Sequence, residues 1–339
     1  MQEAGGKRRT DCLLPTATCL LIPEERLSEP PYGIIAKQLK QGNVIPFLGA
    51  GASLSGRPEE TRWGPQTASF LPSARELARQ LADDASLPST DPYDRDDLAK
   101  VASYYAEVAA NRTDLVACLH QTFDRDYQIG AVHRFLAEVD VPLLIVTTNY
   151  DDLIERAFRE RGKPYHLVAY PTDHKELAAA VLWWKPGASE PEAYSPKALP
   201  LSLTDTTIIY KMHGTVDRQT QKWDSYVITE EDYVDFLARM TGQTAIPARL
   251  MVEFRKRRFL FLGYGLRDWN LRVMLRHLKS ALAMLETSAP SIPDEREDLR
   301  SWAIQRHPSE LEQALWRARK VNIYDMDVDA FVTRLRERM

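Results

Sequence analysis

The stretch VIPFLGAGAS, residues 44–53, places an apolar run directly before two glycines that are separated by one alanine. Residues Val44–Leu48 are short, continuous and β-prone, which is typical of a strand buried on both faces of a sheet. A turn at Gly49, Ala50 and Gly51 can bring backbone N–H groups up to a bound phosphate. The same turn can simply change the direction of the chain, so the rest of the sequence has to decide between the two interpretations.

Composition and charge are typical of an ordinary globular protein. Of the 339 residues, 44% are hydrophobic and 27% are charged, which suffices for a large core in one or two domains. The net charge of −4 gives no overall positive field, so direct binding of nucleic acid is not expected. The basic run at residues 255–258 is interpreted as a solvated helix end. No apolar stretch approaches the roughly 18 residues that a membrane span requires.

The three cysteines indicate a reducing compartment. Cys12, Cys19 and Cys118 are too few and too scattered for a disulfide framework, and none forms a CxxC pair. The first residues resemble a signal peptide only weakly, because Pro15 and Thr16 interrupt the apolar run and no small-residue cleavage site follows. We therefore expect a cytoplasmic protein. Residues 1–30 have an irregular pattern and are expected to form a flexible arm.

Strand patterns alternate with helix patterns along most of the chain. After the strand at 44–48, further strands are expected at residues 143–146, 207–210, 226–228, 259–262 and 321–324. Helices are expected at residues 114–139, 152–161, 230–240, 247–256 and 268–285, and residues 299–339 are expected to be largely helical. This order predicts an α/β fold with a Rossmann-like, doubly wound and mostly parallel sheet.

Two stretches interrupt this alternation. A capping-box pattern from Ser73 to Glu76 begins a helical insertion at about residues 70–140. The polar, proline-rich stretch at about 185–200 is expected to be a loop that forms either a lid or an oligomer contact. The sequence does not distinguish these two roles.

Glycines and small polar residues follow three of the expected strands. The first strand precedes the Gly49–Gly51 turn and Ser53, and the strand at 143–146 precedes Thr148, Asn149 and Asp151. The late strand at 259–262 ends in Gly263, Tyr264 and Gly265. Ligands bind outside the carboxyl ends of the strands in open α/β sheets, so we expect one site here. The first turn lacks the third glycine of the usual dinucleotide fingerprint, which argues against an ordinary dehydrogenase.

A histidine follows a fourth strand. His213 lies next to Gly214, where the chain can bend sharply, and it is the histidine best placed to face a ligand. A single histidine is more often structural than catalytic, and His133 fits that structural interpretation well. Asn149 and Asp151 also have a structural alternative, because either residue can cap the helix that begins at about residue 152.

Four motifs together identify a family. FLGAGAS (47–53), TTNYD (147–151), KMHG (211–214) and FLFLGYGLRDWNLR (259–272) occur in this order. In this combination the chain resembles the sirtuin-like NAD-hydrolysing proteins of bacterial antiphage defence, which are distant relatives of the sirtuin deacylases. The resemblance covers about residues 34–285. It implies a catalytic, NAD-binding domain at 31–286, followed by an extension at 287–339 that completes the fold or forms an oligomer contact.

The resemblance also implies roles for single residues. Asn149 would hold the nicotinamide ribose and a water molecule, Asp151 would lie near the nicotinamide end, and His213 would be the catalytic histidine. The residues that would bind the rest of NAD are Gly49, Ala50, Gly51, Ser53, Thr148, Gly263, Tyr264, Gly265 and Asp268. For Asp268, capping of the following helix is the alternative interpretation.

The implied reaction is cleavage of the nicotinamide–ribose bond of NAD to nicotinamide and ADP-ribose. The chain lacks the two cysteine pairs that hold the structural zinc of the deacylases, so no zinc is expected. Deacylation or ADP-ribosyl transfer is one alternative, and a non-catalytic subunit that senses NAD or ADP-ribose is another. Uncontrolled hydrolysis of NAD would poison a cell. We therefore expect a homo-oligomer and a separate sensor or activator, such as a hexameric ATPase or a nucleic-acid-guided protein.

Overall fold

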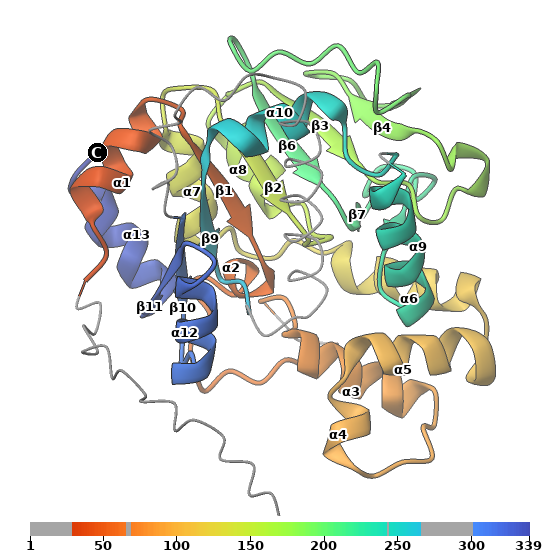
Figure 1. The fold of residues 1–339 in the computed structure, drawn as a ribbon. Coiled ribbons are helices and arrows are strands. Elements are labelled where there is room, and N and C mark those ends of the chain that lie inside the picture. Colours follow the sequence, from red (N-terminus) through yellow and green to blue (C-terminus); the bar gives the residue numbers. More distant parts are fainter. Residues whose placement is uncertain (1–28, 66–68, 243, 266–300) are drawn as a thin grey trace, which may run out of the picture.

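The central element is a mixed β-sheet. The computed structural model describes residues 29–65, 69–242, 244–265 and 301–339, and in these ranges the sheet has nine strands in the order β11-β10-β9-β1-β2-β6-β3-β4-β5 (Figure 1). All strands from β11 to β3 run parallel, and β4 and β5 form an antiparallel edge. The strands are β1 (Val44–Leu48), β2 (Leu144–Thr147), β3 (Tyr165–Ala169), β4 (Val181–Trp184), β5 (Glu192–Tyr194), β6 (Thr207–Lys211), β9 (Arg258–Leu262), β10 (Ser301–Gln305) and β11 (Val321–Asp325).

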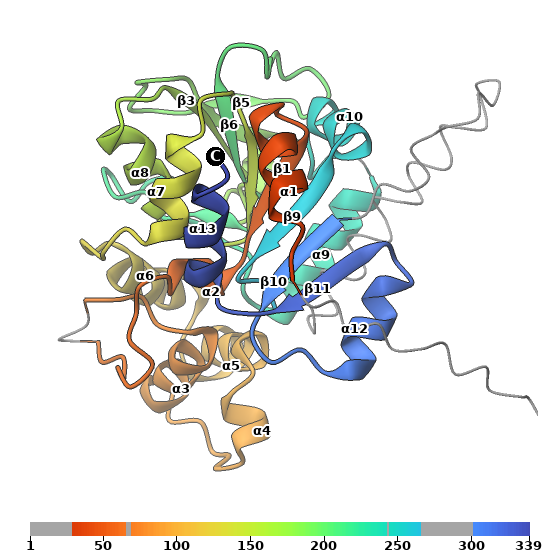
Figure 2. The ribbon, with the colours of Figure 1, turned by 90° about the vertical axis from the view of Figure 1, so that its left-hand side faces the viewer.

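Helices cover both faces of this sheet. Figure 2 shows one face packed by α1 (Tyr32–Lys40), α7 (Ala131–Glu138), α8 (Leu153–Glu160) and α13 (Val328–Arg336). The opposite face is packed by α9 (Glu230–Thr241), α10 (Ala248–Lys256) and α12 (Glu310–Arg317).

Successive side chains of β1 point to opposite faces of the sheet. Val44 and Leu48 join the apolar core on the α7 side, whereas Ile45 and Phe47 join the core on the α10 side. Both sides of β1 are therefore buried, as its continuous apolar sequence predicts. The Rossmann-like, mostly parallel α/β fold expected from the sequence is confirmed.

A helical insertion lies beyond the carboxyl ends of the central strands (Figure 1). It contains α3 (Ala74–Asp84), α4 (Pro92–Arg95), α5 (Leu98–Tyr104), a π-helical turn (Tyr105–Ala109) and α6 (Arg112–Phe123). The predicted capping box is present at the start of α3. Arg112 fastens α6 to the rest of the protein, because its guanidinium forms a two-pronged ion pair with Asp173 and a further bond with Asp232 at 2.8 Å.

The strand order of the sheet reverses at β1. Its neighbours are β9 on one side and β2 on the other, and the strands that follow β1 and β9 in the sequence, β2 and β10, lie in opposite directions along the sheet. Such a switch point opens a crevice at the carboxyl ends of the strands. The short helix α2 (Ala50–Ser53) follows β1 directly at this place.

Several expectations about single elements are wrong. The strand expected at 226–228 is limited to β8 (Ser225–Tyr226), which pairs with β7 (Gly214–Thr215) in a separate two-stranded sheet. The N–H of Ile228 donates instead to Asp232 of α9. Residues 301–305, expected to be helical, form β10 between β9 and β11. The helix expected at 114–139 is divided into α6 and α7.

Other elements were not anticipated at all. Strands β3, β4 and β5 had no predicted counterpart, and β5 lies within the loop expected at 185–200. Their short, aromatic-rich sequences carry neither strict alternation nor a continuous aliphatic run. The helix expected at 268–285 and most of the arm at 1–30 lie outside the described residues. In the described ranges, no helix combines the length and the apolar character that crossing a bilayer would demand.

Candidate functional site

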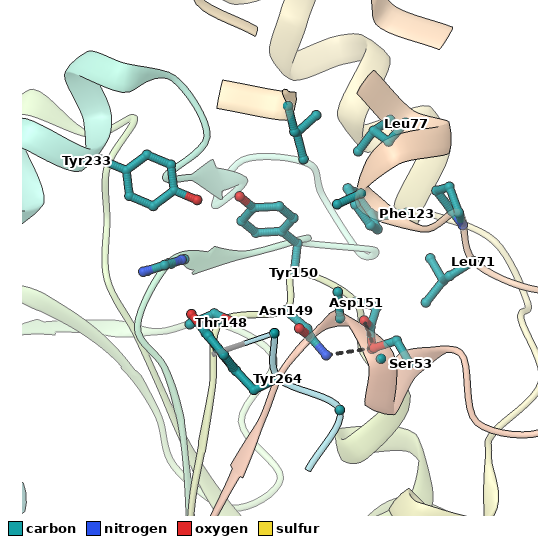
Figure 3. A pocket seen from close by; sticks show the side chains of 18 residues that line it. Ser53, Leu71, Leu77, Phe123, Thr148, Asn149, Tyr150, Asp151, Tyr233 and Tyr264 are labelled. Atoms are coloured by element: carbon teal, nitrogen blue, oxygen red, sulfur yellow. Dashed lines mark hydrogen bonds between the residues drawn. The ribbon is translucent and has the colours of Figure 1, made fainter. Parts of the chain in front are cut away.

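A cavity of about 340 Å³ lies at the carboxyl ends of β1, β2, β6 and β9 (Figure 3). Residues from all four motifs line it: Ala50, Gly51, Ser53, Thr148, Asn149, Asp151, His213, Gly263, Tyr264 and Gly265. The strand register brings the four motifs together, because Leu48 pairs with both Thr147 and Leu262, and Thr147 pairs with Lys211. Gly49 adjoins the cavity without lining it, and Asp268 lies outside the described residues.

The opposite wall of the cavity is apolar and was missed by the sequence analysis. Leu71, Leu77 and Phe123 come from the helical insertion, and Figure 3 shows them across the space from Asn149. Tyr150 and Tyr233 complete this wall. The amphipathic pattern of α3 identifies Leu77 as a buried position, but a buried position in a pattern does not reveal whether it faces a core or a cavity.

The two glycine turns pack directly against each other. The Gly51 N–H donates to the Gly263 carbonyl at 2.8 Å, and the Gly49 N–H donates to the Leu262 carbonyl at 3.1 Å. Gly263 has a φ of +64°, and a Cβ at this residue would lie 2.1 Å from the Ala52 nitrogen. These turns therefore need glycine for their mutual contact, independently of any phosphate.

Asn149 is held by two hydrogen bonds that fix the orientation of its amide. Its Nδ2 group donates to the Gly49 carbonyl at 2.9 Å and to the Ser53 Oγ at 2.7 Å. Ser53 in turn donates to the Asp151 Oδ2 at 2.6 Å, so its oxygen must accept from Asn149. Both amide hydrogens are thus used inside the protein, and the Asn149 Oδ1 is the atom left to accept a hydrogen bond in the cavity.

Asp151 has both carboxylate oxygens engaged. Oδ2 accepts from Ser53, and Oδ1 accepts from the Leu153 N–H at 3.1 Å at the start of α8. The helix-capping alternative therefore describes Asp151, whereas the Asn149 side chain donates to Gly49 and Ser53. Through Ser53, Asp151 fixes the direction of the hydrogen bonds that orient Asn149.

His213 lines the cavity but is only 6% exposed. Its ring packs edge-on against Tyr233 and Phe236, with ring centroids 5.4 and 5.3 Å away. Burial lowers the pKa of His213 to about 3, so the imidazole is neutral at pH 7. The sharp bend after it requires Gly214, whose φ is +92° and whose Cβ would lie 2.0 Å from the Ser225 carbonyl oxygen.

The neutral His213 predicts a pH-dependent stability. Between about pH 6.5 and pH 3 the unfolded chain binds a proton at this histidine and the folded chain does not, so stability falls as the pH is lowered through this range. The contribution is at most about 1.4 kcal/mol per pH unit. The slope of unfolding free energy against pH, measured by urea denaturation, should therefore decrease in His213→Ala by the equivalent of close to one proton near pH 5 and of only about a quarter of a proton at pH 7. An unchanged slope would mean that His213 is charged in the folded protein.

A second cavity of about 600 Å³ shares Gly51, Gly263, Tyr264 and Gly265 with the first. Its polar lining residues are Arg57, Ser73, Glu76, Gln305, Arg306, Asp327 and Asp329, among others. The sequence did not predict this cavity, and β10, which carries Gln305, was expected to be helical. The shared residues make the two cavities neighbours along one continuous surface.

No three His, Cys, Asp or Glu side chains in the described part of the chain come together as metal ligands. Cys12 and Cys19 lie outside that part, and burial raises the pKa of the Cys118 thiol to about 11, which disfavours a metal-binding thiolate. The expected absence of zinc remains a prediction. Metal analysis of the purified protein should give much less than one zinc per chain, and full occupancy would reopen the deacylase interpretation.

Fold and cavity together define the class: a Rossmann-like α/β protein with a ligand site at the switch point of its sheet. The model of the SIR2-like domain family matches residues 143–324, more than half of the chain, and the chain belongs to this family. The resemblance to sirtuin-like proteins inferred from the four motifs is thereby confirmed.

Three relatives illustrate the similarity. The chain is 26% identical over 301 residues to "NAD(+) hydrolase ThsA" of Bacillus cereus (strain MSX-D12), which covers 87% of this chain and 51% of that protein. It is 28% identical over 248 residues to "NAD(+) hydrolase ThsA" of Enterococcus faecium, and the match covers 73% of this chain and 42% of that protein. For "Defense-associated sirtuin 2" of Bacillus subtilis the identity is 22% over 251 residues, and the match covers 72% of this chain and 20% of that protein. The chain thus spans about half or less of each relative.

Proposed function

We propose that this chain hydrolyses the nicotinamide–ribose bond of NAD and releases nicotinamide and ADP-ribose. The observation that carries the proposal is the cavity in which the free Oδ1 of Asn149 and the neutral ring of His213 lie beside two glycine turns. The names of the relatives, NAD(+) hydrolase in two organisms, support the same reaction.

The proposed chemistry assigns Asn149 to the ribose. Nicotinamide leaves as a neutral molecule from a cationic glycosidic linkage, so positive charge develops at the anomeric carbon as in glycoside hydrolysis. The Asn149 Oδ1 accepts a hydrogen bond from a ribose hydroxyl or from the attacking water. Because Gly49 and Ser53 hold the amide, that acceptor is oriented before the substrate binds.

His213 acts as a neutral hydrogen-bond acceptor in this proposal. Burial makes the imidazolium form costly, so the ring orients a hydroxyl or water more readily than it stores a proton. The proton of the attacking water then passes to solvent as the product leaves. Tyr233 and Phe236 fix the plane of the ring.

The two cavities fit the two halves of a dinucleotide. The first cavity, at about 340 Å³, is near the lower limit of about 300 Å³ for ligand pockets. We assign the nicotinamide ribose to it and the adenosine half to the second cavity, with the pyrophosphate over the shared turns at Gly51 and Gly263–Gly265. Thr148, Tyr264 and Asp268 remain proposed contacts to NAD.

The test is direct. Purified protein is incubated with NAD, and free nicotinamide and ADP-ribose are measured by chromatography. Equal amounts of the two products support hydrolysis. Release of nicotinamide only when an acetylated peptide is added would indicate deacylation, and binding of NAD without any product, both alone and with candidate activators, would indicate a sensing subunit.

Control and assembly follow as further parts of the proposal. We infer a cytoplasmic antiphage effector that a separate sensor or activator protein switches on, without direct binding of nucleic acid; one relative carries the name "Defense-associated sirtuin 2". Adding candidate activators, such as a hexameric ATPase or a nucleic-acid-guided protein, to the nicotinamide assay tests this control. A large rise in turnover identifies the partner.

Self-association is expected through α12. Leu311 and Leu315 lie one turn apart on this helix and are 70% and 41% exposed, so together they present a small apolar surface that a second copy of the chain would cover. Sedimentation at micromolar concentration should give a dimer or larger species, and Leu311→Glu should shift it toward the monomer. A monomer in the wild-type protein, with and without an activator, would count against an oligomer.

A further inference from the structure

We propose that Lys211, paired with Glu155, is a positioning residue that holds the turn carrying Asn149 and Asp151 in register with His213. This inference rests on the proposed NAD hydrolysis for its kinetic consequence, but its structural part does not depend on the reaction. No assigned role in the site uses Lys211, which is the last residue of β6 and is fully buried.

The Lys211 ammonium uses all three of its donors. It donates to the Tyr150 carbonyl at 3.0 Å, to the Asp151 carbonyl, and to the Glu155 Oε1 at 2.8 Å. Two of these bonds therefore go to main-chain carbonyls of the turn after β2. The third ties the same ammonium to the first turn of α8.

The position of Lys211 along the chain links this turn to the histidine. Lys211 pairs with Thr147, two residues before Asn149, and the chain reaches His213 two residues after Lys211. One side chain thus sets the distance between the two groups proposed to act on the ribose. A displacement of about 1 Å in such an arrangement can cost about a hundredfold in rate.

Stability alone does not account for the pair. Desolvation of two buried charges is costly, and replacing a buried ion pair by apolar residues of similar size is often neutral or stabilising. Glu155 shows this cost: burial raises the pKa of its carboxyl, and its Oε2 has no hydrogen-bond partner among the described groups. What an apolar pair would not supply is the two bonds to the carbonyls of Tyr150 and Asp151.

The experiment compares Lys211→Met with the double variant Lys211→Met/Glu155→Leu. The double variant leaves no buried charge unpaired, so we expect its thermal midpoint to lie above that of Lys211→Met, although both variants lose the bonds to the Tyr150 and Asp151 carbonyls. Its kcat for NAD should nevertheless fall by about tenfold to a hundredfold while KM changes less than about threefold. Lys163→Met is the matched control, because the Lys163 Nζ also donates to a main-chain carbonyl, that of Val139.

Hydrogen exchange of the amides at residues 148–153 gives a readout that does not need activity. We expect these amides to exchange at least about tenfold faster in the double variant than in the wild type and the Lys163→Met control. If wild-type protein releases no nicotinamide even with an activator present, the proposed function fails while this measurement still tests the role of Lys211. Unchanged exchange in this turn, or full kcat in the folded double variant, would overturn the inference.

Discussion

Asn149→Ala and His213→Ala are each expected to lower NAD turnover by about a hundredfold or more. Asn149→Ala removes the oriented Oδ1 acceptor, and His213→Ala removes the neutral ring acceptor. NAD should still bind, because the glycine turns proposed to hold the pyrophosphate are not changed. The measurement is steady-state release of nicotinamide together with direct titration of NAD binding by calorimetry.

The double variant should be scarcely slower than either single variant, since residues that act together on one group are not additive. Stability needs a separate control. The ring of His213 is almost fully buried between Tyr233 and Phe236, so its removal leaves a cavity and lowers the unfolding free energy, contrary to the small effect expected for a side chain in an open cleft.

His166→Ala is the matched control for this stability effect. Burial also lowers the pKa of His166, and its Nδ1 accepts from the Trp183 indole at 3.2 Å, but it does not line either cavity beside the glycine turns. It should lose some stability and retain turnover. Full turnover in Asn149→Ala or His213→Ala, measured with any activator present, would show that the catalytic assignment is wrong.

The position of the site could be predicted from the sequence because three of its motifs follow continuous apolar strands. Such strands pack side by side in a parallel sheet, and their carboxyl ends then meet at one edge. The pairing of Leu48 with Thr147 and Leu262 realises this arrangement. His213 was placed correctly for the same reason, as it follows β6.

What the sequence could not predict depends on contacts between distant segments. The helical pattern of α3 does not reveal that Leu77 faces the cavity, and no pattern shows that the Asn149 amide is engaged by Gly49 and Ser53. Strand β10 has only five residues, in which Trp302 and Ile304 alternate with small or polar residues. So short a pattern suits either a strand or a helix, and here pairing with β9 and β11 decides it.

Gly263→Ala is expected to have a large effect on the folding of the two glycine turns. Its φ of +64° costs a residue with a Cβ about 1–2 kcal/mol. The new Cβ would also lie 2.1 Å from the Ala52 nitrogen, and overpacking of this kind adds about 1–3 kcal/mol. The sum of these two costs is large compared with a total stability of about 5–15 kcal/mol. We therefore expect the substitution to separate the two turns, lower the thermal midpoint and abolish NAD binding.

Gly265→Ala distinguishes the two interpretations of the glycine turns. A Cβ at Gly265 meets no described atom within 4 Å, so the thermal midpoint should stay within about 2 °C of the wild type. If the dinucleotide backbone approaches this turn closely, the same methyl group should weaken NAD binding about tenfold or more. Gly33→Ala in α1, where the new Cβ also meets no described atom within 4 Å, is the control and should leave binding unchanged. Wild-type affinity in Gly265→Ala would mean that this glycine does not contact the ligand. Wild-type stability and affinity in Gly263→Ala would show that the turns do not depend on their mutual contact.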